Sequence, residues 1–211
     1  MPTDSRHRLT RTYYPEIDFG GFTRADGSVQ FYNRVNALLK ETDVLLDVGC
    51  GRGAWMDSGH DYLKTLRNFK NRCQRVIGID LADAGEANAS LDEFRKLDPA
   101  APRWPVEDQE VDLLFADSVI EHIEEPEAFF RECRRVLKPG GFLCLRTYNV
   151  LHYNGWVSRL VPNRLHHNVL RVAQPDRKEE DVFATWYRCN TPVRMKRLLR
   201  TAGFEACVHT H

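Results

Sequence analysis

Four short apolar runs recur along the chain, and polar or glycine-rich segments bound each of them. The runs cover residues 44–48, 76–80, 111–116 and 142–145. Runs of this length and composition are typical of parallel strands that are buried on both faces. Segments with apolar residues at helical spacing lie before and between them, at 28–40 and 126–137 among others. This alternation predicts an α/β fold with a mostly parallel sheet and right-handed crossovers.

Turn and capping residues set the expected ends of these elements. Ser28 is the expected N-cap of the helix before the first run. The helix after the first run should be interrupted at 57–59, where Asp-Ser-Gly breaks its apolar stripe. A brief strand is expected near 94–97, and Lys-Pro-Gly-Gly at 138–141 should end the helix before the last of the four runs. A final helix should lead into a strand at 204–208.

The turn after the first run carries the clearest chemical signal. Gly49, Gly51 and Gly53 let the main chain turn sharply and let a ligand approach it without meeting a Cβ atom. Asp47 stands beside this turn, and Asp80 ends the second run. Such a turn usually holds a nucleotide-like ligand at the carboxyl edge of an open α/β sheet, where an acid after the second strand accepts hydrogen bonds from ribose hydroxyls. We therefore interpret Asp80 as a ribose ligand in preference to a helix cap or a loop residue.

The overall composition gives no sign of a nucleic-acid or membrane partner. Lys plus Arg and Asp plus Glu balance at 30 each, so no net charge attracts the protein to a polyanion. The six cysteines include no C-x-x-C pair, which indicates reduced thiols in preference to disulfides or a zinc site. The first residues show no secretory signal, and no apolar run approaches the length of a membrane span. A soluble cytoplasmic protein is the expectation.

The length of the chain favours a single domain over 1–211 with one core. We divide it into an N-terminal arm at 1–27, a cofactor-binding core at 28–145, an insertion at 146–190, and a last helix and strand at 191–211. The arm is rich in aromatic residues and glycine, so it either folds onto the surface or forms a lid over the ligand. The insertion interleaves aromatics, histidines and arginines, and an excursion of that length is uncommon unless it has a function.

Four sequence blocks occur in a fixed order between residues 44 and 146. They are Asp47-Val48-Gly49-Cys50-Gly51-Arg52-Gly53, Ile79-Asp80, Val111-Asp112 through Glu121-His122, and Arg135-Val136-Leu137-Lys138-Pro139-Gly140-Gly141. Together they resemble class I S-adenosylmethionine-dependent methyltransferases of the group often called type 11. The glycine block alone would be weak evidence for this family, because it also fits the dinucleotide-binding fingerprint Gly-x-Gly-x-x-Ala. A pyrophosphate prefers a helix N-terminus without acidic groups, however, whereas Asp47 suits a cationic amino group, so NAD is the less favoured ligand.

The resemblance implies S-adenosylmethionine as the cofactor and indicates the residues that bind it. These are Asp47, Gly49, Cys50, Gly51, Gly53, Asp80, Leu81, Asp117 and Ser118. Asp47 and the glycine turn would hold the methionine end, and Asp80 would accept both ribose hydroxyls. Leu81 would pack near the adenine, while Asp117 and Ser118 would line the methyl-donor end.

The resemblance also implies a Rossmann-like methyltransferase fold with helices on both faces of the sheet. That fold usually closes with a final antiparallel strand, whereas this sequence stops around the end of its sixth strand. Either the final strand is missing or the sheet ends differently. A gap in the sheet leaves backbone groups unpaired, so we expect marginal stability or compensation by a partner chain.

No general base is evident from the sequence. His122 is the favoured catalytic candidate, because its block follows the run at 111–116, but a role in ordering the next helix is as strongly expected. Tyr148, Asn149 and His152 follow the last of the four runs and are candidates for binding the acceptor. No metal is expected, because the resemblance to metal-binding methyltransferases with a Glu-x-x-Glu-His block is incomplete: Ser118 takes the place of the first glutamate.

The sequence thus predicts an enzyme that transfers a methyl group from S-adenosylmethionine to a small-molecule acceptor, at oxygen or nitrogen. Two alternatives stay open. One is a non-catalytic S-adenosylmethionine-binding subunit that serves a partner chain. The other is a metal-assisted RNA 2′-O-methyltransferase, although the neutral overall charge makes a nucleic-acid substrate less favoured.

Overall fold

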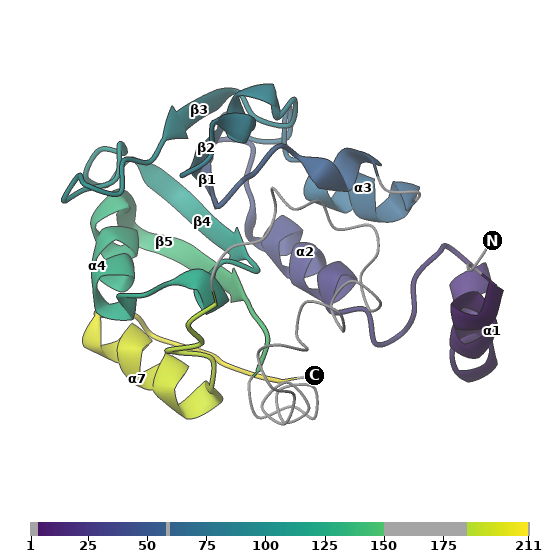
Figure 1. Ribbon diagram of the computed structural model, residues 1–211. Coiled ribbons are helices and arrows are strands. Elements are labelled where there is room, and N and C mark those ends of the chain that lie inside the picture. The colour runs from purple at the N-terminus through teal and green to yellow at the C-terminus, as the bar shows by residue number, and fades with distance from the viewer. Residues whose placement is uncertain (1–3, 58–59, 150–184, 211) are drawn as a thin grey trace. The chain divides into compact units, whose positions relative to one another are not determined.

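The computed structural model describes residues 4–57, 60–149 and 185–210 (Figure 1). Its helices are α1 (Asp4–Tyr13), α2 (Gly27–Leu38), α3 (Asp61–Arg67), α4 (Pro126–Val136) and α7 (Pro192–Thr201). Its strands are β1 (Val44–Val48), β2 (Arg75–Asp80), β3 (Glu93–Lys96), β4 (Val111–Asp117) and β5 (Leu137–Arg146). Short 3₁₀ helices are η1 (Pro15–Asp18), η2 (Ala54–Asp57), η3 (Asp83–Ala87) and η4 (Ile120–His122). The chain divides into a first compact unit of residues 1–115, 136–144 and 211, and a second of residues 116–135 and 145–210.

The five strands form one sheet in the order β3-β2-β1-β4-β5. β1 pairs in parallel with β2 on one side and with β4 on the other, and β2 pairs in parallel with β3. The strand order therefore reverses at β1, and open α/β sheets bind ligands outside the carboxyl ends of their strands at such a point. The α/β, Rossmann-like fold class is confirmed, and so is the brief third strand, which lies one residue before its expected position.

The core of the first unit lies between α2, α3 and one face of the sheet. Three buried aromatic rings meet in this core: Tyr32 of α2, Phe69, which follows α3, and Phe115 of β4. Their ring centroids lie 5.4–6.2 Å apart. Leu45 and Leu46, which are neighbours on β1, are both fully buried. Because neighbouring residues of a strand point to opposite faces, both faces of β1 are covered, as its apolar run predicts.

Ion pairs join the strands at the amino edge of the sheet, where the parallel strands begin. Arg75 of β2 and Arg95 of β3 both bind Glu110, which precedes β4, at nitrogen–oxygen distances of 2.8 Å. Lys138 of β5 binds Asp112 of β4 at 2.7 Å, and Asp112 also accepts a hydrogen bond from the first backbone N–H of β1. Asp112 and Lys138 belong to the sequence blocks that resemble type 11 methyltransferases. Both therefore stabilise this edge of the sheet.

Two expected helix boundaries are wrong. The N-cap of α2 is Asp26, not Ser28, because the Asp26 carboxylate accepts hydrogen bonds from the backbone N–H groups of Ser28 and Val29 at 2.9 and 3.1 Å. α4 ends at Val136, and the residues 138–141 lie inside β5. Glycine at position 140 has a left-handed φ of 80°, so the turn that the glycines signal is absorbed within the strand.

The expected strand at 204–208 is also absent from the described sheet. Half-buried and exposed residues alternate there, as the sequence pattern predicts, but the segment pairs with none of the five strands. Alternating burial requires only one covered face, whereas a strand also requires a neighbour with unpaired backbone groups. The expected interruption after the glycine turn is confirmed, since η2 ends at Asp57 and α3 begins at Asp61.

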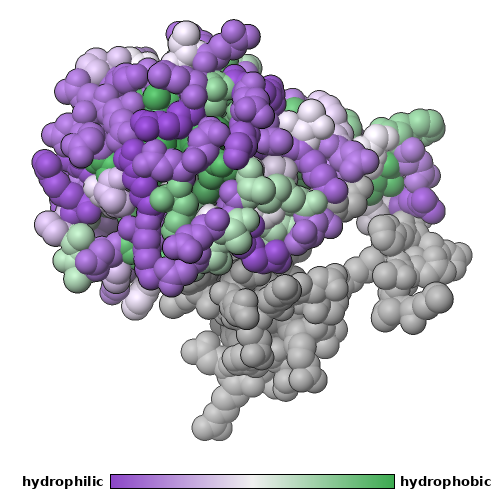
Figure 2. Space-filling view, turned by 90° about the horizontal axis from the view of Figure 1, so that it is seen from above, coloured by the Kyte–Doolittle hydropathy of each residue, from purple (hydrophilic) through white to green (hydrophobic). Residues whose placement is uncertain are grey.

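The N-terminal arm contacts α3 through an aromatic pair. The rings of Phe22 and Tyr62 stack with their centroids 5.2 Å apart. Within the arm, Arg11 binds Asp18 at 2.8 Å. On the face drawn in Figure 2, hydrophilic residues predominate and hydrophobic ones show in small patches between them. Within the described ranges, no helix combines the length and the apolar character needed to cross a membrane.

Candidate functional site

Hydrogen bonds tie the glycine turn after β1 to the end of β2. The backbone N–H groups of Gly49 and Cys50 donate to the carbonyl oxygen of Ile79, at 2.8 and 3.3 Å. The N–H of Gly51 donates to Oδ2 of Asp80 at 2.9 Å. The turn and the Asp80 carboxylate are therefore held together at the carboxyl edge of the sheet.

Two glycines of the turn serve different purposes. Gly51 has a left-handed φ of 50°, and a Cβ atom added there would meet no atom within 4 Å. Gly53 also has a left-handed φ, of 73°, but a Cβ atom there would lie 2.7 Å from Oδ1 of Asn88. Gly51 thus leaves open space beside the main chain, where a ligand can approach, whereas Gly53 permits close packing.

Asp80 keeps hydrogen-bonding capacity beyond its contacts within the chain. Its Oδ2 accepts from the N–H of Gly51 and its Oδ1 accepts from the N–H of Ala82, both at 2.9 Å. A carboxylate offers about four acceptor positions, so about two remain. Two hydroxyl donors, such as those of a ribose, match that number. Leu81, the next residue, is 51% exposed and places an apolar side chain at the same edge.

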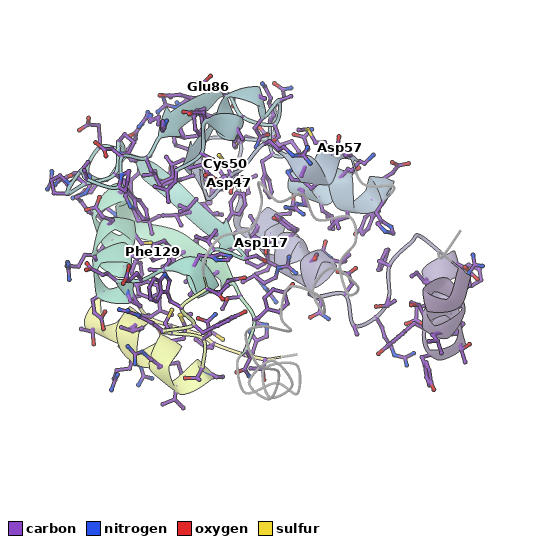
Figure 3. All side chains as sticks on the ribbon, viewed as in Figure 1. Asp47, Cys50, Asp57, Glu86, Asp117 and Phe129 are labelled. Atoms are coloured by element: carbon purple, nitrogen blue, oxygen red, sulfur yellow. The ribbon has the colours of Figure 1, made fainter. Side chains whose placement is uncertain are left out.

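Cys50 lies inside the turn as an inert thiol. Burial raises its pKa strongly, and the nearby carboxylates of Asp47 and Asp80 raise it further. Figure 3 labels Asp47 and Cys50 close together where β1 ends. Because the thiolate is the reactive form of cysteine, this raised pKa does not favour nucleophilic attack by Cys50.

Asn88 is a residue of this edge that sequence reasoning missed. Its Nδ2 group donates to the carbonyl oxygens of Cys50 and Gly51, both at 3.1 Å. Its Oδ1 accepts from the backbone N–H and the hydroxyl of Ser90, at 3.1 and 2.6 Å. Asn88 is only 5% exposed. It lies in a stretch without apolar periodicity, so the pattern of the sequence carries no signal for it.

Asp117 and Ser118, predicted at the methyl-donor end, lie in the second unit. Nε and Nη2 of Arg146 bind the two oxygens of Asp117 at 2.7 and 2.8 Å, and the Asp117 side chain is 9% exposed. The hydroxyl of Ser118 donates to Asp117 at 3.2 Å, and its N–H donates to the carbonyl oxygen of Arg146 at 3.0 Å. Ser118 has a left-handed φ of 60°, which is uncommon for serine. The Asp117–Arg146 ion pair therefore lies next to a residue with an uncommon backbone conformation, at the end of β4.

Glu121 and the catalytic candidate His122 end η4 in the second unit. Glu121 is 3% exposed, and its Oε2 accepts a hydrogen bond from the hydroxyl of Thr147 at 2.7 Å. Its carbonyl oxygen accepts from the N–H groups of Trp186 and Tyr187, at 2.8 and 3.1 Å. Glu121 therefore anchors residues 186 and 187, near the end of the insertion at 146–190. His122 is half-buried.

The acceptor candidates follow β5 in the same unit. Tyr148 is 66% exposed, and its backbone carbonyl oxygen accepts a hydrogen bond from Nδ2 of Asn190 at 3.2 Å. Asn149 is half-buried, whereas His152 lies outside the described residues. In the part of the chain that the structure describes, no three His, Cys, Asp or Glu side chains are grouped as a metal ion would require.

Comparison with known proteins identifies the family of this part of the chain. A family model described as a methyltransferase domain matches residues 46–145. Those residues are a methyltransferase domain. The resemblance of the four sequence blocks to class I S-adenosylmethionine-dependent methyltransferases is thereby confirmed.

Individual relatives of this methyltransferase domain agree with the family match. A malonyl-[acyl-carrier protein] O-methyltransferase of Marinomonas sp. is 30% identical over 112 residues, which cover 52% of this chain and 39% of that protein. A ubiquinone biosynthesis O-methyltransferase of Pseudomonas fluorescens is 30% identical over 124 residues, which cover 55% of this chain and 47% of that protein. The chain thus spans less than half the length of these two curated relatives.

A solved structure shares the fold. It is a chain of the complex between the Haloferax volcanii Trm112 methyltransferase activator and a methyltransferase, with a TM-score of 0.53 and 19% identity. The match covers 95% of this chain and 73% of that one. S-adenosylmethionine is the cofactor of this family, and the first unit fits it. Gly51 leaves the main chain open, and Asp80 keeps acceptor positions for ribose hydroxyls.

Proposed function

We propose that the chain transfers a methyl group from S-adenosylmethionine to a small-molecule acceptor, at oxygen or nitrogen. One observation carries the cofactor part of this proposal. The carboxyl edge of the first unit combines an open glycine main chain at Gly51 with the Asp80 carboxylate, which retains about two acceptor positions. A nucleoside with two ribose hydroxyls has the donors that this edge can accept.

Each part of the edge has a distinct task in this proposal. Asp47 and the backbone of the glycine turn bind the amino and carboxylate groups of the methionine end. Asp80 accepts the ribose hydroxyls, and the exposed Leu81 packs near the adenine. On the family resemblance, Asp117 and Ser118 act at the methyl-donor end. The Asp117–Arg146 ion pair supports a positioning role there, because it holds the end of β4 together with the end of β5.

When bound, S-adenosylmethionine supplies a methyl group on a sulfonium, whose sulfur is already a good leaving group. The chain therefore has to align the acceptor in line with the methyl group and to exclude water. His122 removes the proton of a hydroxyl or amine acceptor as it attacks. Tyr148 and Asn149, together with His152, contact the acceptor. The exposure of the Tyr148 ring supports this role, since the ring is available for contact.

Binding and transfer can be tested separately. Calorimetry of the full chain with S-adenosylhomocysteine tests the cofactor site, and we expect saturable binding. Tritiated-methyl S-adenosylmethionine is then supplied with a cell extract, and label should enter the small-molecule fraction. Binding without transfer would point to a non-catalytic subunit. Label in RNA that disappears with EDTA and returns with magnesium would support the RNA alternative instead.

The catalytic role of His122 needs a readout of its own. His122→Gln should lower the rate of methyl transfer while the affinity for S-adenosylhomocysteine stays unchanged. Tyr148→Phe should change the acceptor KM more than kcat, because Tyr148 is proposed to bind the acceptor. An unchanged rate in the His122 variant would assign that residue to the packing of η4.

A partner chain is a further part of the proposal. One solved structure with the same fold is a chain of a complex with a methyltransferase activator, and the five described strands include no closing antiparallel strand. Light scattering of the purified chain, combined with a thermal melt, tests this idea. A stable monomer with full activity would remove the need for a partner.

A further inference from the structure

The glycine turn of this chain has little helical support. In doubly wound folds the turn leads directly into a helix whose first residues help to fix it. Here the turn leads into η2, a 3₁₀ helix of four residues, and α3 begins only at Asp61. The backbone carbonyls of the turn therefore need partners from another segment.

Asn88 supplies those partners from the segment between β2 and β3. Its Nδ2 group donates to two consecutive carbonyl oxygens, those of Cys50 and Gly51. Only an amide offers two donors on one nitrogen together with an acceptor on the same planar group. Ser90 uses that acceptor, since both its N–H and its hydroxyl donate to Oδ1. The orientation of the Asn88 amide is thus fixed by four hydrogen bonds.

The two contacts of Gly51 connect Asn88 to the cofactor site. Its N–H is held by Asp80, and its carbonyl oxygen is held by Asn88. A shift of Gly51 would therefore move the open main chain and would also release one hydrogen bond of the Asp80 carboxylate. Gly53, against which Asn88 packs, constrains the other end of the turn.

We propose that Asn88 is a positioning residue that, with Ser90, presets the turn and Asp80 for the cofactor. This inference rests on the proposed function, because the bound molecule is taken to be S-adenosylmethionine. Asn88 acts through Gly51 and Asp80. Its effect should therefore appear in cofactor affinity, beyond any general effect on stability.

The test compares Asn88→Ala with a matched asparagine in the same unit. Asn36 of α2 also donates to two backbone carbonyl oxygens, those of Tyr32 and Leu66, at 2.6 and 2.9 Å. Both variants should lower the melting temperature, since each removes two side-chain hydrogen bonds to backbone carbonyl oxygens. Asn88→Ala should weaken the binding of S-adenosylhomocysteine about tenfold or more, whereas Asn36→Ala should change it less than about twofold.

Two further variants keep the inference testable if Asn88→Ala fails to fold. Asn88→Asp keeps the shape but cannot donate when ionised, so it should weaken binding at least as much as Asn88→Ala. Ser90→Ala leaves Asn88 in place and removes one of its four hydrogen bonds, so a loss of about threefold is expected. Wild-type affinity in a folded Asn88 variant, or in Ser90→Ala, would overturn the inference. An equal loss in Asn36→Ala would do the same. If the wild-type chain itself does not bind S-adenosylhomocysteine, the proposed function fails first.

Discussion

The two edges of the sheet in the first unit hold their carboxylates in opposite ways. At the amino edge, Glu110 and Asp112 bind arginine and lysine side chains at 2.7–2.8 Å. At the carboxyl edge, Asp80 is held by two backbone N–H groups. A cation partner neutralises a carboxylate and occupies its oxygens, whereas backbone amides orient it and leave charge and acceptor positions for a ligand. The amino edge is therefore built for stability and the carboxyl edge for binding.

Replacing the central carboxylate of each edge should give the largest contrast. Asp80→Asn removes the charge and puts an amide nitrogen where an oxygen now accepts a hydrogen bond. Hydrogen bonds to a charged acceptor contribute about 1.5–3 kcal/mol each, so S-adenosylhomocysteine should bind about 100-fold more weakly in calorimetry. Asp112→Asn, the matched change at the amino edge, should lower the melting temperature and leave affinity within about twofold. Equal affinities in both variants would remove the functional distinction between the edges.

A pair of glycines allows a more local comparison. Gly51 at the carboxyl edge and Gly140 in β5 both have left-handed φ angles, of 50° and 80°, and both face open space. Alanine at either position should cost about 1–2 kcal/mol in unfolding free energy, because the strain of the backbone is the same. Only Gly51→Ala should also weaken S-adenosylhomocysteine binding, by about tenfold, since its methyl group would enter the space left for the ligand. Chemical denaturation and calorimetry measure the two effects, and a similar loss of affinity in Gly140→Ala would contradict the assignment.

The sequence predicted the carboxyl edge better than the supports around it. Asp47, the glycine turn and Asp80 were recognisable because they lie at or beside the end of an apolar run, and the end of a parallel strand fixes its place on the sheet. Asn88 was not recognisable, because its partners are main-chain oxygens 37 and 38 residues away in the sequence. A hydrogen bond over that separation produces no periodic pattern of residues in the sequence. The N-cap of α2 was misassigned for a related reason: Asp26 and Ser28 are both good capping residues, and the choice depends on where the helix begins.

The amino edge should show its role in the pH dependence of stability. The guanidinium of Arg95 holds the pKa of Glu110 at about 2, well below its usual value of 4.5, and also lowers the pKa of Glu93. A carboxyl group whose pKa is lowered by folding stabilises the protein above its unfolded pKa, and this contribution is lost as the pH falls from about 4.5 to about 2. Glu110→Gln should lower the unfolding free energy at neutral pH by about 1 kcal/mol and flatten this acid decline, with cofactor affinity unchanged. If the unfolding free energy of the variant falls with pH as steeply as that of the wild type, other carboxyl groups cause the loss of stability in acid.

The carboxyl edge makes a smaller prediction through Cys50. Burial and the two nearby carboxylates raise the pKa of this thiol, so little thiolate forms at about pH 8 and alkylation should be slow. Cys207 is exposed and serves as an internal control, which iodoacetamide should label first in a peptide mass spectrum. Asp80→Asn should accelerate the labelling of Cys50 only slightly, because burial is the main cause of its raised pKa and the carboxylates add less. A large acceleration would instead mean that the variant opens the turn, and the loss of affinity in Asp80→Asn would then reflect a displaced main chain as well as lost acceptor positions.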